Sequence, residues 1–151
     1  MEFSPPGITD GIRHPATQPK RILVIDDDPC VGAAIGAILA GFNYETVHES
    51  RAYAGIQTLR QSVFDVVMID IFLPGLSGLD AIGYVRSGSS IPIIAMSGFR
   101  LRSSIEPVDY LGMATQRGAT LCMRKPFRPA QLIEAVDSSG SLRPPIKSPI
   151  C

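Results

Sequence analysis

The sequence contains no tryptophan, only three cysteines and no excess of charge of either sign. Cys30, Cys122 and Cys151 are odd in number and widely spaced, without a C-x-x-C pair, so we read them as free thiols in a reducing compartment, the cytoplasm. Fourteen basic residues balance fourteen acidic ones, which gives no indication of electrostatic binding to nucleic acid or to a membrane. The N-terminus has no basic segment followed by an apolar core, so no signal peptide is expected.

Long hydrophobic runs are also missing. The longest run of small and apolar residues, Val31 to Phe42, is shorter than the roughly 20 residues that cross a bilayer. It contains Gly32 and Gly36 in a G-x-x-x-G spacing, which we read as the close-packed face of a soluble helix. No membrane partner is therefore expected.

The remaining composition is that of one ordinary globular domain. The chain has 151 residues, 45% of them hydrophobic and 19% charged, which is enough for a single packed core. Residues 1–19 and 138–151 are rich in proline, glycine and polar residues without periodicity. We expect both to be flexible tails on either side of a folded domain at 20–137.

Within that domain, apolar runs of strand length alternate with helical patterns. The expected strands are 21–25, 44–48, 66–70, 91–96 and 119–124, and the expected helices are 29–40, 49–61, 78–86, 107–117 and 129–136. This alternation predicts an α/β fold, a doubly wound (βα)5 flavodoxin-like domain whose five-stranded parallel sheet has the order 2-1-3-4-5.

The stretch from Val66 to Gly78 is the centre of this pattern. Its apolar run suits a strand buried on both faces, and Asp70 stands where the strand ends. Leu73-Pro74-Gly75 cannot continue the strand, because proline lacks the N–H and restricts the residue before it. Asp70 therefore lies at the carboxyl end of a central strand, where open α/β sheets bind their ligands.

Polar residues follow the other strands as well. They are Asp26 and Asp27 after the first strand, the lower-ranked His48 and Glu49 at the second, Ser97 after the fourth and Lys125 after the fifth. The carboxyl ends of parallel strands lie at the same edge of the sheet. The order 2-1-3-4-5 makes the first and third strands neighbours, which brings Asp26, Asp27 and Asp70 into one cleft. Carboxylates about 4 Å apart repel by roughly 4 kcal/mol per pair at an effective dielectric constant of about 20, so protons or a cation must bind. Oxygen ligands with room for water favour Mg²⁺ or Mn²⁺.

Together these groups suit phosphoryl transfer. A divalent cation, the Lys125 ammonium and the Ser97 hydroxyl would position and neutralise a phosphoryl group, with Asp70 as the nucleophile that forms an aspartyl phosphate. Each residue also has a purely structural interpretation, because an acidic triplet caps helices, a serine suits a turn and a lysine suits the surface. Their conjunction at four strand ends favours the chemical interpretation.

Four motifs are specific in their order and spacing. They are Ile22-Leu23-Val24-Ile25-Asp26-Asp27-Asp28-Pro29, Asp70 with Leu73-Pro74 and Gly78, Ser97-Gly98, and Lys125-Pro126-Phe127. In these motifs the sequence resembles the response-regulator receiver domains of two-component signalling, over about residues 20–137. The resemblance implies that Asp70 accepts phosphate from a histidine kinase or a histidine phosphotransfer protein and then switches binding to a downstream protein target. It implies no enzyme activity beyond self-phosphorylation and self-dephosphorylation.

The resemblance also implies the metal ligands. Asp27, Asp70 and the backbone carbonyl of Phe72 would ligate Mg²⁺, and Asp26 would act through water. Phe72 and Phe99 each follow a site residue by two positions, which in the family flank the path of the hydrolytic water. Two aromatic rings there are expected to exclude that water and slow self-dephosphorylation; the alternative is that each ring only packs against its loop.

The remaining implied roles come with departures from the family pattern. Ser97 and Lys125 would bind the phosphoryl oxygens, Ser97 would take part in the switch, and the peptide bond before Pro126 would be cis. The aromatic switch residue of many receivers would fall three positions before the lysine, where this chain has Cys122. The segment 99–118 is longer than in the simplest members, and no output domain follows the last helix, which is typical of a stand-alone receiver.

Three other functions fit the sequence less well. A phosphohydrolase with Asp26 as nucleophile and Asp28 as acid or base fits the D-x-D spacing, but Pro29 and Cys30 depart from that family's pattern and no segment could form a substrate cap. A flavin-binding electron carrier of the same topology would need Ser, Thr or Gly in the first loop to cradle a phosphate, and Asp26-Asp27-Asp28 would repel one. A pseudo-receiver that binds partners without phosphorylation stays open.

Overall fold

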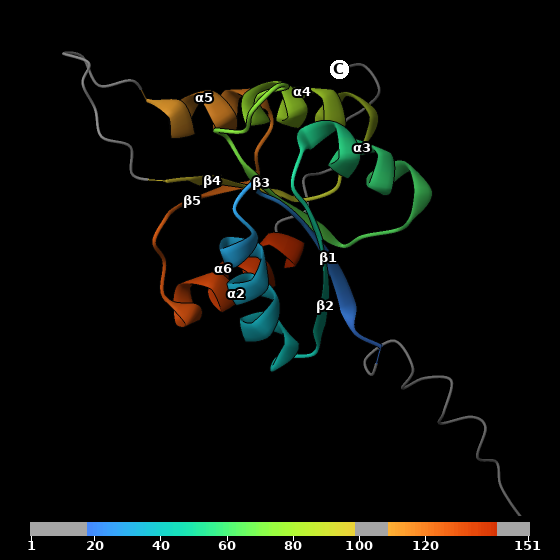
Figure 1. Ribbon diagram of the computed structural model, residues 1–151, viewed down its shortest axis with the longest axis vertical. Coiled ribbons are helices and arrows are strands. Elements are labelled where there is room, and N and C mark those ends of the chain that lie inside the picture. The colour runs from blue at the N-terminus through green and yellow to red at the C-terminus, as the bar shows by residue number, and fades with distance from the viewer. Residues whose placement is uncertain (1–17, 99–108, 142–151) are drawn as a thin grey trace, which may run out of the picture.

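The computed structural model describes residues 18–98 and 109–141, in which five strands alternate with five helices (Figure 1). The strands are β1 (Lys20–Ile25), β2 (Tyr44–Glu49), β3 (Val66–Asp70), β4 (Ile93–Ser97) and β5 (Leu121–Arg124). The helices are α2 (Pro29–Ala40), α3 (Ala52–Gln61), α4 (Gly78–Gly88), α5 (Tyr110–Arg117) and α6 (Pro129–Ser141).

All strand pairs are parallel, and the sheet has the order β2-β1-β3-β4-β5. The fold class expected from the sequence is therefore confirmed. The register pairs Ile25 with both Glu49 and Ile69, and Asp70 with Met96. The carboxyl ends of the central strands consequently stop at the same edge of the sheet.

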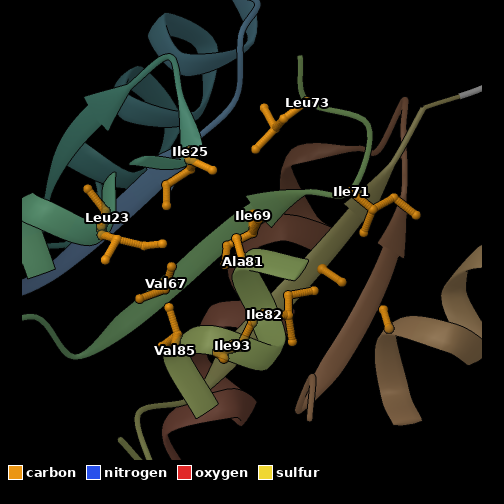
Figure 2. Packing of buried hydrophobic residues seen from close by; sticks show 14 of the residues in the cluster. Leu23, Ile25, Val67, Ile69, Ile71, Leu73, Ala81, Ile82, Val85 and Ile93 are labelled. Atoms are coloured by element: carbon orange, nitrogen blue, oxygen red, sulfur yellow. The ribbon is translucent and has the colours of Figure 1, made fainter. Parts of the chain in front are cut away.

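Two layers of helices cover the sheet, with α3, α4 and α5 on one face and α2 and α6 on the other (Figure 1). Alternate strand residues enter the two cores: Leu23 and Val67 face α3 and α4 (Figure 2), whereas Ile22 and Met68 face α2 and α6. Every residue of β3 and β4 is buried, as their continuous apolar runs predict.

Side-chain caps determine where three of the helices begin. The Asp28 carboxylate accepts a hydrogen bond from the Cys30 N–H at 2.9 Å, and Ser77 Oγ accepts one from the Asp80 N–H at 3.2 Å. Asp109 caps α5 in the same way. Each cap satisfies an N–H that the first turn leaves without a helical partner, so the polar loop residues position the helices against the sheet.

Helix α2 packs closely on β2 through the two glycines of its G-x-x-x-G spacing. A Cβ atom on Gly32 would lie 2.6 Å from the ring of His48, and one on Gly36 would lie 2.9 Å from Thr46 Oγ1. The interpretation of this run as a close-packed helix is confirmed. No helix within the described residues is long and apolar enough to cross a membrane.

Several element boundaries differ from the expectation. Helix α6 continues to Ser141 instead of ending near residue 136, because the hydroxyls of Ser138 and Ser139 donate to helix carbonyls and offset the polar composition. Val63, expected on the apolar face of α3, is 83% exposed, because α3 ends at Gln61. Strands β4 and β5 each begin two residues later than expected. Of the expected tails at 1–19 and 138–151, residues 1–17 and 142–151 lie outside the described residues, as do the start of the expected 107–117 helix and Phe99.

Candidate functional site

Three carboxylates meet at the carboxyl edge of the sheet, where β1 and β3 end. An oxygen from each of Asp26, Asp27 and Asp70 lies within 4.8 Å of the other two. Asp26 is 0% exposed and Asp70 is 5% exposed, whereas Asp27 reaches solvent. The cluster therefore has two acids fixed inside the protein and one acid at its open side.

Lys125 supplies the positive charge of this cluster. Its Nζ lies 2.8 Å from Asp26 Oδ2 and 3.1 Å from Asp70 Oδ2, so a single ammonium bridges the two buried acids. Lys125 follows β5, and its backbone N–H donates to the Ser97 carbonyl at 2.8 Å. The peptide bond between Lys125 and Pro126 is cis, as the family resemblance implies.

Backbone groups orient both buried acids. The Asp28 N–H donates to Asp26 Oδ1 at 2.9 Å, and the Phe72 N–H donates to Asp70 Oδ1 at 2.8 Å. A Cβ atom on Gly78 would lie 2.1 Å from the carbonyl oxygen of Asp70, so the start of α4 presses directly on the backbone of the site. Each acid thus has one oxygen held by an N–H and the other held by Lys125.

Burial and the neighbouring charges shift the pKa values of Asp70 and Lys125. Burial raises the pKa of Asp70, and the charge of Asp26 adds to that rise, whereas the Phe72 N–H and Lys125 oppose it. Burial alone would lower the pKa of Lys125, but the hydrogen bonds and charges of Asp26 and Asp70 outweigh burial and raise it. Lys125 is therefore held in its charged form, while the burial that raises the pKa of Asp70 favours neutralisation of its carboxylate.

Ser97 and Phe72 lie beside the carboxylate cluster without closing it. Ser97 ends β4 one position after the partner of Asp70, and its hydroxyl donates to the Gly98 carbonyl at 3.5 Å. Within the described residues no hydrogen bond joins that hydroxyl to Asp70 or Lys125. The Phe72 ring packs edge-to-face on Tyr110 of α5, with the ring centroids 4.8 Å apart.

Cys122 lies on the α5 side of the sheet. Its Sγ is 3.5 Å from the Leu111 carbonyl oxygen and 3.5 Å from Thr115 Oγ1. Both partners belong to α5, so the residue at the expected switch position contacts this helix through a small thiol.

A comparison with protein families gives one match that spans most of the chain. The family model of the response regulator receiver domain matches residues 22–137. The chain belongs to this family. The acidic cluster, Lys125 after the last strand and the parallel sheet agree with membership of this family.

The curated relatives of this receiver are longer proteins. The DNA-binding response regulator MtrA of Mycolicibacterium smegmatis is 29% identical over 120 residues, which are 80% of this chain and 50% of that protein. Regulatory protein VanR of Enterococcus faecium is 30% identical over 116 residues, 77% of this chain and 48% of that protein. The chain thus spans about half the length of these relatives.

Solved structures match the fold of the receiver. A putative response regulator from Chloroflexus aurantiacus has a TM-score of 0.73 at 24% identity, with 82% of this chain and 99% of that chain covered. The chemotaxis response regulator CheY4 of Vibrio cholerae has a TM-score of 0.70 at 21% identity, with 81% and 99% covered. At such identities the two likenesses support the fold alone.

The donor set of the receiver fits a hard divalent cation. All three ligating groups are carboxylates, their oxygens converge, and the exposed side of Asp27 leaves access for water. Mg²⁺ and Mn²⁺ prefer such oxygen sites and retain water ligands. Both oxygens of Asp26 and both oxygens of Asp70 already accept hydrogen bonds, so Asp27 is the member of the cluster that is exposed to solvent.

Sequence reasoning ranked one contact of this site too low. The His48 ring lies 2.7 Å through Nε2 from the backbone carbonyl oxygen of Asp26, although His48 comes from the edge strand β2. Glu49, ranked with it, accepts a hydrogen bond from Thr58 Oγ1 at 2.6 Å and contributes its carbonyl to the Asp26 N–H. The signal for His48 was its position at a strand end, together with a glycine at the facing position of α2.

Proposed function

We propose that Asp70 accepts a phosphoryl group from the phosphohistidine of a histidine kinase or a histidine phosphotransfer protein in the cytoplasm. Phosphorylation then changes which downstream protein the receiver binds. One observation carries this proposal: Lys125 joins Asp70 to the buried Asp26 at the open carboxylate cluster. That arrangement supplies both a nucleophile and the positive charge that a transferred phosphoryl group requires.

The proposed step is a direct displacement at phosphorus. A carboxylate oxygen of Asp70 forms the new O–P bond while the N–P bond of the donor breaks, and the donor imidazole leaves with that electron pair. The Lys125 ammonium and the Ser97 hydroxyl are proposed to receive the phosphoryl oxygens. Hydrolysis of the aspartyl phosphate by water then restores the Asp70 carboxylate and releases inorganic phosphate. In this proposal the receiver is the substrate of its own chemistry and turns over no other substrate.

A bound Mg²⁺ ion would supply further positive charge for the phosphoryl oxygens. We propose Asp27, Asp70 and the backbone carbonyl of Phe72 as its protein ligands, with Asp26 acting through water. The N–H of Phe72 already bonds the Asp70 carboxylate, which keeps this loop next to the cluster.

Protein partners fit the proposal better than nucleic acid or membrane. The composition carries no net charge, and the acidic cluster would repel a phosphate backbone. MtrA is named as a DNA-binding protein, and this chain spans half of its length, so DNA binding is not proposed for the described residues. That this protein acts as a stand-alone receiver, without an attached output domain, stays a prediction.

The experiment is labelling with a small phosphodonor. Incubation with phosphoramidate and Mg²⁺ should add the mass of one phosphoryl group to the intact protein, and peptide mapping should place it on Asp70. Asp70→Asn should abolish the adduct, whereas Asp80→Asn, an exposed acid on α4, should leave it unchanged. Equal labelling of Asp70→Asn and the parent would contradict the proposal.

The phosphohydrolase receives less support from the site. The Asp28 carboxylate, which the hydrolase would need as its acid or base, caps α2 by accepting a hydrogen bond from the Cys30 N–H. Turnover of a generic phosphate ester would favour the hydrolase, and an unlabelled but partner-binding protein would favour the pseudo-receiver.

A further inference from the structure

His48 is the one imidazole that touches the carboxylate cluster within the described residues. It lies at the end of β2, half-buried, with Nε2 2.7 Å from the carbonyl oxygen of Asp26. A carbonyl oxygen only accepts, so Nε2 carries the proton and donates it.

The contacted carbonyl belongs to the peptide unit that joins Asp26 to Asp27. The side chain of Asp26 is held by Lys125 and the Asp28 N–H, and its own N–H donates to the Glu49 carbonyl at 3.0 Å. Within the described residues, the hydrogen bond from His48 is the one made to the carbonyl of the peptide that follows Asp26. The direction of that peptide determines where the exposed carboxylate of Asp27 points.

Helix α2 keeps the His48 ring in place. A Cβ atom on Gly32 would lie 2.6 Å from Cγ and Cδ2 of the ring, closer than real Cβ atoms approach. The ring is therefore confined between the buried glycine of α2 and the loop that follows β1. The chain supplies space at Gly32 for an imidazole, and the imidazole supplies a donor to the loop.

We propose that His48 is a positioning residue for the metal site: its Nε2–H fixes the Asp26–Asp27 peptide so that the Asp27 carboxylate meets Asp70. This inference rests on the proposed function and extends it to a residue outside the ligand set. Groups that hold a metal ligand in orientation change affinity without contacting the ion, and their removal costs about tenfold or more.

The chain offers a matched control at the neighbouring contact between α2 and β2. Thr46 lies two residues before His48 on the same side of β2, and Gly36 faces it from α2 with a would-be Cβ contact of 2.9 Å. Substitutions at Thr46 and Gly36 disturb the same α2–β2 packing, but they do not touch the loop of the metal site.

The test measures Mg²⁺ binding to the unphosphorylated protein by calorimetric titration. His48→Leu should weaken binding about tenfold, Thr46→Val should stay within about twofold, and His48→Gln should recover most of the loss, because its amide N–H reaches as far as Nε2. In labelling with phosphoramidate, His48→Leu should raise the Mg²⁺ concentration for half-maximal rate while the rate at saturating Mg²⁺ stays close to that of the parent.

Two results would overturn the role of His48: equal Mg²⁺ affinity in His48→Leu and Thr46→Val, or no recovery in His48→Gln. If His48→Leu does not fold, Gly32→Ala replaces it with Gly36→Ala as its control, and equal affinity in those two variants overturns the inference. A parent protein that binds no Mg²⁺ would overturn the proposed function as well, whereas a parent that binds it isolates the failure to His48.

Discussion

At the scale of single residues, Lys125 decides whether two buried carboxylates can coexist. Its side chain is 17% exposed, and its ammonium bridges Asp26 and Asp70 at 2.8 and 3.1 Å. Removal of one partner from such a buried group leaves an uncompensated charge. A cation at the cluster would replace part of the missing charge, so the effect of Lys125 should depend on Mg²⁺.

We therefore expect Lys125→Met to lower the free energy of unfolding by about 3–5 kcal/mol without Mg²⁺, and by less in saturating Mg²⁺. The control is Arg117→Met, which removes an ion pair of 3.1 Å to Asp80 whose side chains are 42% and 61% exposed. That exposed pair should contribute less than about 1 kcal/mol. Urea unfolding measures both losses, and similar losses in the two variants would contradict a buried role for Lys125.

Phe72 is the second residue whose role can be tested by substitution, because water exclusion and packing by its ring predict different results. Its ring packs on Tyr110, and its backbone N–H donates to the Asp70 carboxylate that we propose as the phosphate acceptor. If the ring excludes water, Phe72→Asn should speed phosphate loss several-fold, whereas Phe72→Leu should keep the lifetime close to that of the parent. The measurement is the decay of the aspartyl phosphate after removal of the donor. An unchanged lifetime in both Phe72→Asn and Phe99→Asn would leave only the packing interpretation.

At the scale of elements, the beginning of α4 lies directly against the site because Gly78 has no side chain. A Cβ atom on Gly78 would lie 2.1 Å from the Asp70 carbonyl oxygen and 2.4 Å from Ile71 Cα. Both contacts are with backbone, which cannot move aside as a flexible side chain can. The first turn of α4 would have to shift, and the loop that carries Phe72 would shift with it.

Gly78→Ala is accordingly expected to cost about 3 kcal/mol of stability, as overpacking against rigid neighbours does. Gly88→Ala at the other end of α4 is the control, because an added Cβ there meets nothing within 4 Å. It should change stability by less than about 0.5 kcal/mol. Chemical denaturation of both variants decides the matter, and an equally small effect at the two glycines would show that the loop adapts.

The elements also show how far the sequence could predict the structure. Asp26, Asp70 and Lys125 could be expected to meet, because parallel strands end at one edge whatever their side chains do. The bond from His48 to Asp26 could not, because it depends on the rotamer of His48 and on how closely α2 approaches β2. The length of α6 was missed for a related reason, since Ser138 and Ser139 satisfy their hydroxyls on the helix itself. Contacts fixed by topology were therefore predictable, and contacts fixed by side-chain conformation were not.

At the scale of the whole molecule, the proposed metal site would couple cation binding to the stability of the fold. The acids come from the loop after β1 and the end of β3, so the cluster forms only when the sheet is assembled. An ion that binds the folded protein alone stabilises it by mass action, by about 2.7 kcal/mol when its concentration is 100 times its dissociation constant. Mg²⁺ should consequently raise the melting temperature of the parent by several degrees.

Asp27→Asn is the variant that tests this coupling, because Asp27 is the exposed member of the cluster and its loss leaves the core intact. Without Mg²⁺ we expect this variant to melt slightly above the parent, since one of three mutually repelling carboxylates has become neutral. With Mg²⁺ the order should reverse, because the parent gains the binding energy and the variant gains little of it. Asp80→Asn, an exposed acid away from the cluster, should follow the parent in both conditions. Thermal melts across a Mg²⁺ titration measure the crossover, and parallel curves for the parent and Asp27→Asn would mean that the ion does not bind where the three acids meet.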